Sequence, residues 1–314
     1  MGDKYLTFEE LNKSVNRLAH GLLALGVQRG DRIAIWDSNS LEFLVINYAI
    51  LKCGAISVTI NFRYKVDEML YVVNDSTPEL LFYGNELVPI LRQADSKLDH
   101  VTKVAISGKV SENGKSMEEL MAGQSDEEPE VIVDPADPAF IMYTGGTTGF
   151  PKGVLNSHGA ILAFAKGLVY EGDLRHNDLM MVSMPMFHNG ALNYQLVPTL
   201  MVGAASLIMT GTFDAGVVLA AIEKYGVTAT LWVPSMLARL VNDPNSQKYR
   251  CPTLKKIWYG ASTISPTVLN ASREMLKADF YQLYGLTETG CVSILKPEDH
   301  IDKFAYTGRE IFSA

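Results

Sequence analysis

Short apolar segments alternate with helix-forming segments along almost the whole chain. An apolar run of about 4–8 residues bounded by glycine or polar residues is typical of a buried strand. Such runs predict strands at residues 32–36, 56–60, 80–83, 101–106, 140–143, 179–183, 206–209, 228–232, 256–259 and 279–283. Repeated alternation of strand and helix indicates mainly parallel sheets with helices on both faces. The strands are too numerous for one open twisted sheet, so we expect an α/β fold with two packed, mainly parallel sheets flanked by helices.

The expected sheets divide the chain into two subdomains. Residues 20–170 would form the first α/β layer, and residues 1–19 together with 180–300 would form the second. The segment 124–138 differs from its surroundings because it holds three prolines and an acidic cluster at 126–128. This composition indicates a solvated linker.

Local capping signals mark the first two helices. The pattern Thr7-x-x-Glu10 is a capping box, in which the threonine hydroxyl and the glutamate carboxylate each accept a backbone N–H. Apolar residues at spacings of three and four between 11 and 25 then predict one buried helix face, and Gly26 follows where that helix ends. Ser40 starts a second predicted helix, which runs to residue 51.

Charge and cysteine content argue against several classes of protein. The 314 residues carry a net charge of -8, so no basic surface offsets the repulsion of nucleic-acid phosphates. Cys53, Cys251 and Cys291 lack paired or C-x-x-C spacing, which argues against a disulfide framework or a zinc site and fits a reducing compartment. The N-terminus has no signal-peptide apolar core, and the most apolar stretch, 196–209, is too short to cross a bilayer. We therefore expect a cytoplasmic protein without a transmembrane segment or a nucleic-acid partner.

The first chemical signal is the glycine-rich segment 143–154, which follows a predicted strand. It combines open backbone N–H groups, hydroxyls and one cation at Thr144, Gly145, Gly146, Thr147, Thr148, Gly149 and Lys152. Such a loop can wrap a polyphosphate because no Cβ blocks the close approach of the glycines. It differs from the loop of P-loop kinases and GTPases, because Pro151 precedes the lysine and Gly153 stands where that loop has serine or threonine. The alternative interpretation is a simple hairpin tip.

A second cluster at 281–290 also joins a predicted strand to a turn that contains glycine. Tyr284, Gly285, Thr287 and Glu288 offer an aromatic face, a close-approach glycine, a hydroxyl and a carboxylate. These groups suit stacking on a base, hydrogen bonding to phosphate and binding of magnesium, which prefers hard oxygen ligands. A buried tyrosine beside a capped turn would explain the same residues without a ligand.

The two segments together resemble the signatures of the adenylate-forming (AMP-binding) superfamily, which includes acyl-CoA synthetases, peptide-synthetase adenylation domains and luciferases. The phosphate loop of that family reads Tyr-Thr-Ser-Gly-Thr-Thr-Gly-x-Pro-Lys-Gly-Val, and this chain matches every fixed position except Gly145, where serine is usual. The family's second signature, Tyr-Gly-x-Thr-Glu, matches residues 284–288. The resemblance covers nearly the whole chain and is greatest to acyl-CoA synthetases. It implies that 1–314 are an incomplete AMP-binding N-terminal domain, without the small barrel and the C-terminal lid.

The resemblance also implies roles for the matched residues. Thr144, Thr147, Thr148 and Lys152 would serve the β- and γ-phosphates. Gln282 would reach the adenine amino edge, Tyr284 would stack on the base, Thr287 would contact the α-phosphate and Glu288 would hold Mg²⁺. The segment 260–262 is similar to the small-residue strand end that lies against the other adenine face and the acyl carbonyl, although it also fits an ordinary strand-to-helix turn. The implied nucleotide-binding set is Thr144, Gly145, Gly146, Thr147, Thr148, Gly149, Lys152, Gly260, Ala261, Ser262, Gln282, Leu283, Tyr284, Gly285 and Thr287. The implied catalytic set is Lys152, His188, Thr287 and Glu288.

His188 lies in the segment 185–190, which resembles the Pro-Leu-Phe-His segment of the same family. The resemblance implies that His188 gates the entry of carboxylate and thiol through orientation and electrostatics; an isolated histidine is otherwise more often structural. Methionines at 180, 181, 184 and 186 fit either core packing or an apolar acyl tunnel. Asp214 could hold the ammonium group of an amino-acid substrate or cap a helix. The remaining histidines lack metal-ligand spacing and are predicted to be surface or capping residues: His20, His100, His158, His176 and His300.

The implied reaction has two steps. A hydrophobic carboxylate attacks the α-phosphate of ATP to give an acyl-adenylate, and coenzyme A then displaces AMP; positioning and electrostatics supply most of the catalysis. The family's ribose-binding Asp segment and its lid lysine do not follow residues 307–309, so we expect this core to bind nucleotide weakly and to show little turnover by itself. The alternatives are an amino-acid or aryl-acid adenylation domain that loads a carrier protein, an oxidative luciferase, and a non-enzymatic nucleotide-binding module. The sequence leaves the oligomeric state open, including a homodimer.

Overall fold

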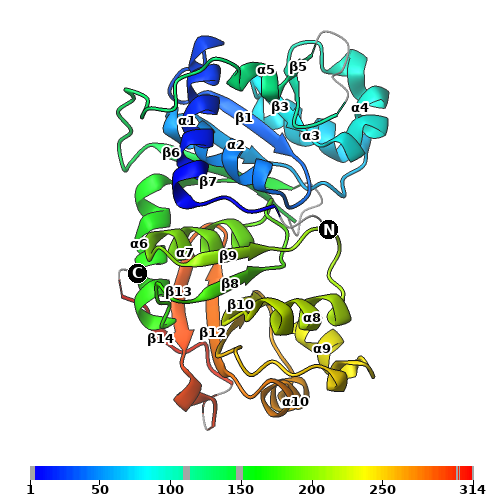
Figure 1. Cartoon of the computed structure of the whole chain (residues 1–314), viewed down its shortest axis with the longest axis vertical. Coiled ribbons are helices and arrows are strands. Elements are labelled where there is room, and N and C mark those ends of the chain that lie inside the picture. The colour runs from blue at the N-terminus through cyan, green and yellow to red at the C-terminus, as the bar shows by residue number, and fades with distance from the viewer. Residues whose placement is uncertain (1–3, 109–113, 146–150, 302, 304, 313–314) are drawn as a thin grey trace. The chain divides into compact units, whose positions relative to one another are not determined.

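A computed structural model of the chain describes residues 4–108, 114–145, 151–301, 303 and 305–312 (Figure 1). It divides into two compact units, Met1–Gly159 and Ala160–Ala314. The described residues form two sheets, each with seven strands and mostly parallel pairing, and helices flank both sheets. The expectation of an α/β fold with two mainly parallel sheets and flanking helices is therefore confirmed.

The first unit is built on a sheet with the strand order β5-β4-β3-β1-β2-β6-β7. Its strands are β1 (Arg32–Trp36), β2 (Ile56–Thr59), β3 (Leu80–Tyr83), β4 (Thr102–Ala105), β5 (Lys115–Ser116), β6 (Pro138–Thr144) and β7 (Lys152–Ser157). Its helices are α1 (Phe8–Ala24), α2 (Leu41–Lys52), α3 (Val66–Ser76), α4 (Val88–Ala94) and α5 (Met117–Met121), with 3₁₀ turns η1 (Asn85–Leu87) and η2 (Asp95–Lys97). All neighbouring strands are parallel except β6 and β7. The central strands β1, β2 and β3 are buried along nearly their whole length, which explains why they are continuous apolar runs.

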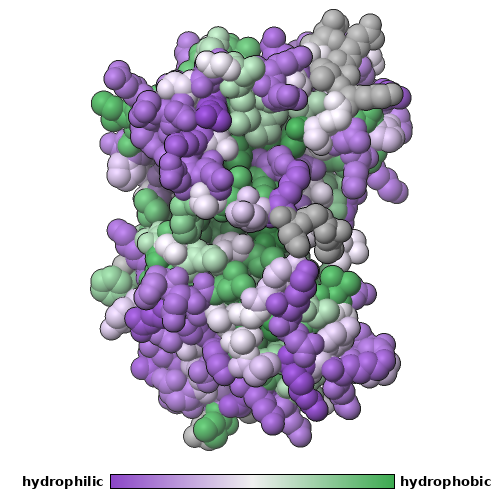
Figure 2. Space-filling model, viewed as in Figure 1, coloured by the Kyte–Doolittle hydropathy of each residue, from purple (hydrophilic) through white to green (hydrophobic). Residues whose placement is uncertain are grey.

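The capping box at the start of α1 forms as the sequence predicts. The Thr7 hydroxyl accepts the Glu10 N–H at 3.1 Å, and the Glu10 carboxylate accepts the Thr7 N–H at 2.7 Å. The apolar face of α1 packs against α2 and α5, while its outer face is mostly hydrophilic (Figure 2). This packing places α1 with the first sheet, which differs from the expected grouping of residues 1–19 with the second. The expected boundaries 20–170 and 180–300 differ in the same way from the division after Gly159.

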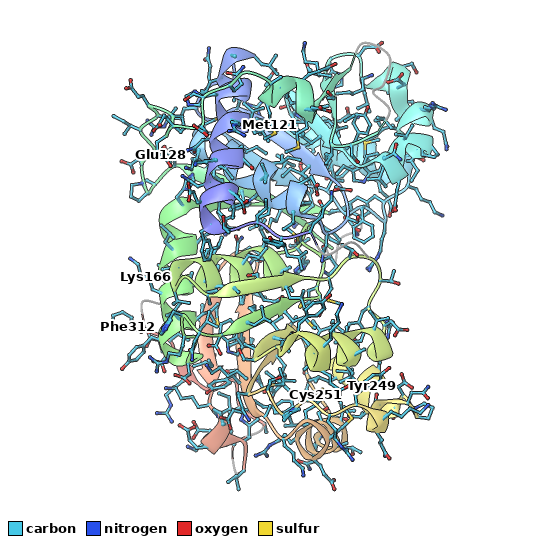
Figure 3. All side chains as sticks on the ribbon, viewed as in Figure 1. Met121, Glu128, Lys166, Tyr249, Cys251 and Phe312 are labelled. Atoms are coloured by element: carbon cyan, nitrogen blue, oxygen red, sulfur yellow. The ribbon has the colours of Figure 1, made fainter. Side chains whose placement is uncertain are left out.

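The segment between α5 and β6 is tied to this unit by ion pairs. The carboxylate of Glu128 projects beside α1 (Figure 3), where it accepts hydrogen bonds from Lys52 at 2.5 Å and Asn12 at 2.7 Å. These two bonds lower the pKa of Glu128 to about 2. Asp126 pairs with Arg17 at 3.0 Å. The acidic cluster therefore anchors the segment to α1 and α2, whereas its composition indicates a free, solvated linker.

The second unit is built on a sheet with the strand order β14-β13-β12-β11-β10-β8-β9. Its strands are β8 (Leu179–Val182), β9 (Ala205–Ile208), β10 (Ala229–Trp232), β11 (Lys256–Gly260), β12 (Asp279–Leu286), β13 (Gly290–Leu295) and β14 (Arg309–Glu310). Its helices are α6 (His158–Glu171), α7 (Val197–Met201), α8 (Ala215–Tyr225), α9 (Pro234–Asn242) and α10 (Pro266–Leu276), with the π-helical η3 (Gly190–Leu196) and 3₁₀ turns η4 (Ser246–Lys248) and η5 (Pro297–His300). Strands β9, β8, β10, β11 and β12 are parallel, and β13 and β14 are antiparallel to their neighbours. No helix in the described ranges is long and apolar enough to cross a membrane.

All three cysteines are free thiols. Cys53 at the end of α2 and Cys291 in β13 are buried, and desolvation raises the pKa of each thiol to about 12. Cys251, before β11, is partly buried, and desolvation raises its pKa to about 11. At neutral pH the three side chains are therefore thiols of low reactivity.

Candidate nucleotide-binding site

The glycine-rich segment joins two antiparallel strands of the first unit. Thr144 at the end of β6 lies opposite Lys152 at the start of β7 in the strand register, so β6 and β7 are the two arms of a hairpin. The predicted residues Gly146, Thr147, Thr148 and Gly149 lie outside the described part of the chain. The hairpin base is fixed to α3, because the Tyr143 hydroxyl donates to the Asp75 carboxylate at 2.6 Å. The sequence did not predict β7, since its Lys-Gly-Val start reads as part of the loop.

Lys152 presents a free charge at this hairpin. Its side chain is exposed, and no carboxylate among the described residues forms an ion pair with it. Thr144 is partly exposed and Gly145 is exposed beside it. The hairpin therefore presents a cation, a hydroxyl and open backbone at its base, as a phosphate-binding loop requires.

Gly145 is the one position where the loop departs from the family pattern, and the structure leaves room for the usual serine. A Cβ on Gly145 would meet no described atom within 4 Å, and its φ lies outside the left-handed region. We expect Gly145→Ser to leave the melting temperature unchanged. A hydroxyl that reaches a phosphate should strengthen ATP binding by roughly fivefold to tenfold, the effect of about one hydrogen bond. Calorimetric titration of both forms with ATP measures this, and equal affinities would show that residue 145 does not contact the phosphates.

The remaining predicted residues lie in the second unit, at one edge of its sheet. Strands β8, β11 and β12 are connected through parallel pairing, so their carboxyl ends lie at the same edge. His188 follows β8, Ala261 and Ser262 follow β11, and Thr287 and Glu288 follow β12. Ligands of parallel α/β sheets bind at this edge. The topology of this unit thus gathers segments that are distant in the sequence.

The backbones of β11 and β12 approach each other closely at Gly260. Gly260 is opposite Leu283 in the register, and a Cβ on it would lie 2.2 Å from the Leu283 carbonyl oxygen. The next residue, Ala261, has a φ of 68°, a left-handed conformation that costs a non-glycine residue roughly 1–2 kcal/mol. Ala261 and Ser262 are both exposed. Strain retained in an exposed strand end is typical of a functional segment.

The second predicted signature forms the end of β12 and a tight turn. The strand continues to Leu286, past the predicted end at residue 283, with a register irregularity between Tyr284 and Gly285. A Cβ on Gly285 would lie 1.9 Å from the Gly290 carbonyl oxygen of β13, so only glycine fits there. The Tyr284 side chain is 49% exposed, which leaves its ring available for stacking. Glu288 is exposed in the turn, and no described cation forms an ion pair with its carboxylate.

His188 lies between β8 and η3. The residue is exposed, and the Gly190 N–H donates to Nδ1 at 3.3 Å. Protein atoms around the ring desolvate it and lower its pKa. The ring is therefore neutral at pH 7, with its proton on Nε2.

Two alternatives at this edge are decided by the contacts. The carboxylate of Asp214 accepts the Val217 N–H at 2.9 Å and caps α8, so the helix-cap interpretation is correct. Met180, Met181 and Met186 are fully buried, which supports core packing for these methionines.

The sequence missed a buried histidine behind the second signature. His300 was expected at the surface or as a cap, but its side chain is only 3% exposed. It lies beside the Tyr259 ring, with 5.8 Å between the ring centroids, and the Tyr259 hydroxyl in turn contacts Gln282. His300 has no motif around it, and only the fold of η5 brings it to β11. No pattern in the sequence indicates the contact between His300 and Tyr259.

These features define a class of protein before any comparison. Two mainly parallel α/β units, a glycine-rich hairpin with a free lysine, and a Tyr-Gly-x-Thr-Glu turn together describe the N-terminal domain of an adenylate-forming enzyme. Residues 1–313 match the family model described as AMP-binding enzyme. The chain belongs to the AMP-binding enzyme family.

The chain is similar to characterised ligases of this family. It is 33% identical over 302 residues to the fatty acid–[acyl-carrier-protein] ligase ScoC of Streptomyces coeruleorubidus, which covers 94% of this chain and 56% of the relative. It is 30% identical over 310 residues to the long-chain-fatty-acid–CoA ligase FadD13 of Mycobacterium tuberculosis, which covers 98% of this chain and 60% of the relative. The crystal structure of the inhibitor-bound N-terminal domain of FACL13 from M. tuberculosis superposes with a TM-score of 0.89 at 30% identity, covering 98% of this chain and 76% of that one. The chain thus spans little more than half the length of the curated relatives it matches.

Proposed function

We propose that this chain supplies the nucleotide-binding part of an ATP-dependent acid–thiol ligase, which activates a hydrophobic carboxylic acid as its adenylate and transfers the acyl group to coenzyme A. The observation that carries the proposal is the pair of signatures, each beside a strand end and each with one exposed charge. Lys152 in the first and Glu288 in the second are exposed, and neither forms an ion pair with another residue that the structure describes. The names of relatives that act on fatty acids support a hydrophobic substrate.

The residues of the chain have distinct proposed tasks in the first step. Lys152 and the loop backbone bind the β- and γ-phosphates and oppose the charge that develops on the leaving pyrophosphate. Thr287 orients the α-phosphate toward the carboxylate. Glu288 fits a magnesium site because an exposed, unpaired carboxylate is the ligand that Mg²⁺ takes together with phosphate oxygens and water. When bound, Mg²⁺ neutralises phosphate charge during displacement.

His188 is proposed to act as a neutral donor. Because Nδ1 accepts the Gly190 N–H, the proton on Nε2 is the one that can point toward a carboxylate. A neutral ring with a fixed donor orients that group without giving it a proton. This matches the task of orientation that the family resemblance implies.

One relative supports an alternative to coenzyme A as the thiol that accepts the acyl group. ScoC is named as a ligase for an acyl-carrier protein, so a carrier-protein phosphopantetheine thiol is the alternative to coenzyme A. An amino-acid substrate is less well supported, since Asp214 is engaged as a helix cap. Offering coenzyme A and a holo-carrier protein separately, and measuring thioester formation, distinguishes the two acceptors. The cytoplasmic location and the homodimer stay predictions.

The proposal is tested by removing each unpaired charge in the complete protein that contains this chain. We expect Lys152→Met to lower acid-dependent ATP–pyrophosphate exchange by about 10²–10³-fold, because it removes a preorganised contact to developing charge. Glu288→Gln should lower the same exchange by at least about tenfold, because it removes a proposed magnesium ligand. The matched controls are Lys166→Met on the exposed side of α6 (Figure 3) and Glu274→Gln on α10, both outside the proposed site. Exchange that both site variants leave unchanged would favour a non-enzymatic nucleotide-binding module.

A further inference from the structure

A continuous line of side-chain hydrogen bonds runs from η5 to Gln282. The His300 Nδ1 lies 2.7 Å from the Lys296 carbonyl oxygen, and its Nε2 lies 3.1 Å from the Tyr259 hydroxyl. That hydroxyl donates to Gln282 Oε1 at 2.9 Å, and Gln282 Nε2 donates to the Tyr306 carbonyl oxygen at 3.2 Å. We call this set the β11–η5 relay. It lies entirely within the second unit.

The inner members of the relay are held rigidly. The Tyr259 side chain is fully buried, with the Phe280 ring 6.2 Å and the His300 ring 5.8 Å from its own. Water does not reach a hydroxyl in this position, so each unmade hydrogen bond costs about 1–3 kcal/mol. Gln282 is only partly buried. The relay therefore connects a rigid, dry interior to a side chain at the candidate site.

The relay determines which way the Gln282 carboxamide faces. A carboxamide has an accepting oxygen and a donating nitrogen at nearly equal positions, and its orientation is set by its partners. Turning it over would bring Oε1 against the Tyr306 carbonyl oxygen, which cannot donate. The observed orientation leaves one lone pair on Oε1 and one hydrogen on Nε2 for a ligand.

The fixed orientation determines which purine base the Gln282 carboxamide can bind. A glutamine carboxamide accepts from the 6-amino group of adenine and donates to an adjacent ring nitrogen. At the N1 edge a 6-oxo purine presents an acceptor and a ring N–H, which require the reversed carboxamide. At the N7 edge it presents two acceptors, which fit neither orientation. We propose that Tyr259 and His300 are positioning residues, which hold the Gln282 carboxamide in one orientation and so make the site select a 6-amino over a 6-oxo purine. This rests on the proposed function and on the contact with the adenine amino edge that the family resemblance implies for Gln282.

The hydrogens available in the relay depend on the protonation of His300. The Lys296 carbonyl requires a proton on Nδ1, so a neutral His300 has only a lone pair on Nε2. The single Tyr259 hydroxyl hydrogen then cannot serve both Nε2 and Gln282 Oε1. A protonated His300 donates to the Tyr259 oxygen instead, and every bond of the relay is made at once.

Several charged groups act on His300 from the elements around it. Desolvation lowers its pKa most, the Lys296 carbonyl raises it, and Arg273 on α10 lowers it. Asp299 and Glu298 on η5 itself raise the pKa. Since burial has the largest effect, full protonation of the relay requires a pH below the ordinary pKa of histidine. Selection of the 6-amino purine should therefore increase as the pH falls.

The test compares AMP with inosine monophosphate, which differs from AMP at the 6-position and its neighbouring nitrogen. Both are titrated into this chain by calorimetry, for the wild type, Tyr259→Phe, His300→Leu and His300→Gln. We expect the ratio of AMP to inosine monophosphate affinity to fall roughly fivefold to tenfold in Tyr259→Phe, the effect of about one hydrogen bond. His300→Leu removes the Nε2 lone pair that competes for the Tyr259 hydrogen, so its ratio should equal the low-pH value of the wild type at every pH. His300→Gln keeps a donor near the Nε2 position, as protonated His300 does, and should hold the ratio at the low-pH value of the wild type. Tyr281→Phe is the matched control, because Tyr281 adjoins Gln282 on β12 but takes no part in the relay.

A change of pH separates positioning from a merely structural role. The wild-type ratio should rise between pH 8 and pH 5.5, and the His300→Gln ratio should not change, since the phosphate groups of the two ligands titrate alike. A wild-type ratio that does not change with pH, or equal losses for both ligands in Tyr259→Phe, would overturn the inference while leaving the proposed function intact. Failure of the wild-type chain to bind AMP would overturn both.

Discussion

Replacing Gly260 with alanine should remove nucleotide binding and strongly destabilise the second unit. The new Cβ would lie 2.2 Å from the Leu283 carbonyl oxygen, and this backbone atom is held in place by the pairing of β11 with β12. Overpacking of a core usually costs about 1–3 kcal/mol, and a clash with backbone belongs at or above the upper end of that range. Separation of β11 from β12 would also displace Gln282 and Tyr284. We expect AMP affinity to fall more than tenfold, with a clear drop in the urea midpoint.

The neighbouring residue provides the control for this prediction. Ala261→Gly is the reverse exchange, because it removes one methyl group at the adjacent residue. Glycine adopts the φ of 68° found there without strain. The free energy of unfolding should stay the same or rise by up to about 1 kcal/mol. Equal stability of Gly260→Ala and the wild type would contradict the strand register described above.

Gly21→Ala is expected to be the most damaging conservative change in the first unit. Gly21 lies on the buried face of α1, and a Cβ there would lie 2.1 Å from the Leu120 carbonyl oxygen of α5. In an exposed helix the same substitution stabilises a protein by about 1 kcal/mol. Here the clash reverses the sign, and we expect a loss of about 3 kcal/mol or more. Thermal unfolding followed by circular dichroism measures it.

Gly216→Ala in α8 is the matched substitution without a clash. Its Cβ would have Asp214 as its nearest neighbour, at 3.4 Å, an ordinary contact. This variant should be as stable as the wild type or slightly more so. If Gly21→Ala behaved in the same way, the close packing of α1 on α5 would be disproved.

The sequence predicted the regular parts of the fold because a parallel strand is a continuous apolar run. Residues 32–36 and 80–83 are the exact bounds of β1 and β3. Strands β7 and β13 were not predicted because each follows a glycine-containing segment and pairs antiparallel to its neighbour. The expected grouping of residues 1–19 with the second sheet differs from the packing of α1 on α2 and α5, since helix amphipathicity indicates which face is buried but not which partner covers it.

For the candidate site, the sequence identified the segments that carry functional residues but not the residues that hold those segments in place. Motifs located Lys152, Gly260 and Glu288 in segments that follow predicted strands, and the structure shows why glycine is needed at 260. The partners that hold these segments, such as Asp75 behind Tyr143, come from elements with no motif of their own. Such contacts are set by tertiary packing, which single-sequence patterns do not encode.

The reactivity of one buried thiol in each unit measures the unfolding of that unit separately. Cys53 belongs to Met1–Gly159 and Cys291 to Ala160–Ala314, and both are fully enclosed and protonated. A thiol reagent reaches either of them only when its own unit opens. The order in which the two are modified during slow denaturation would therefore distinguish one cooperative unfolding event from two independent ones.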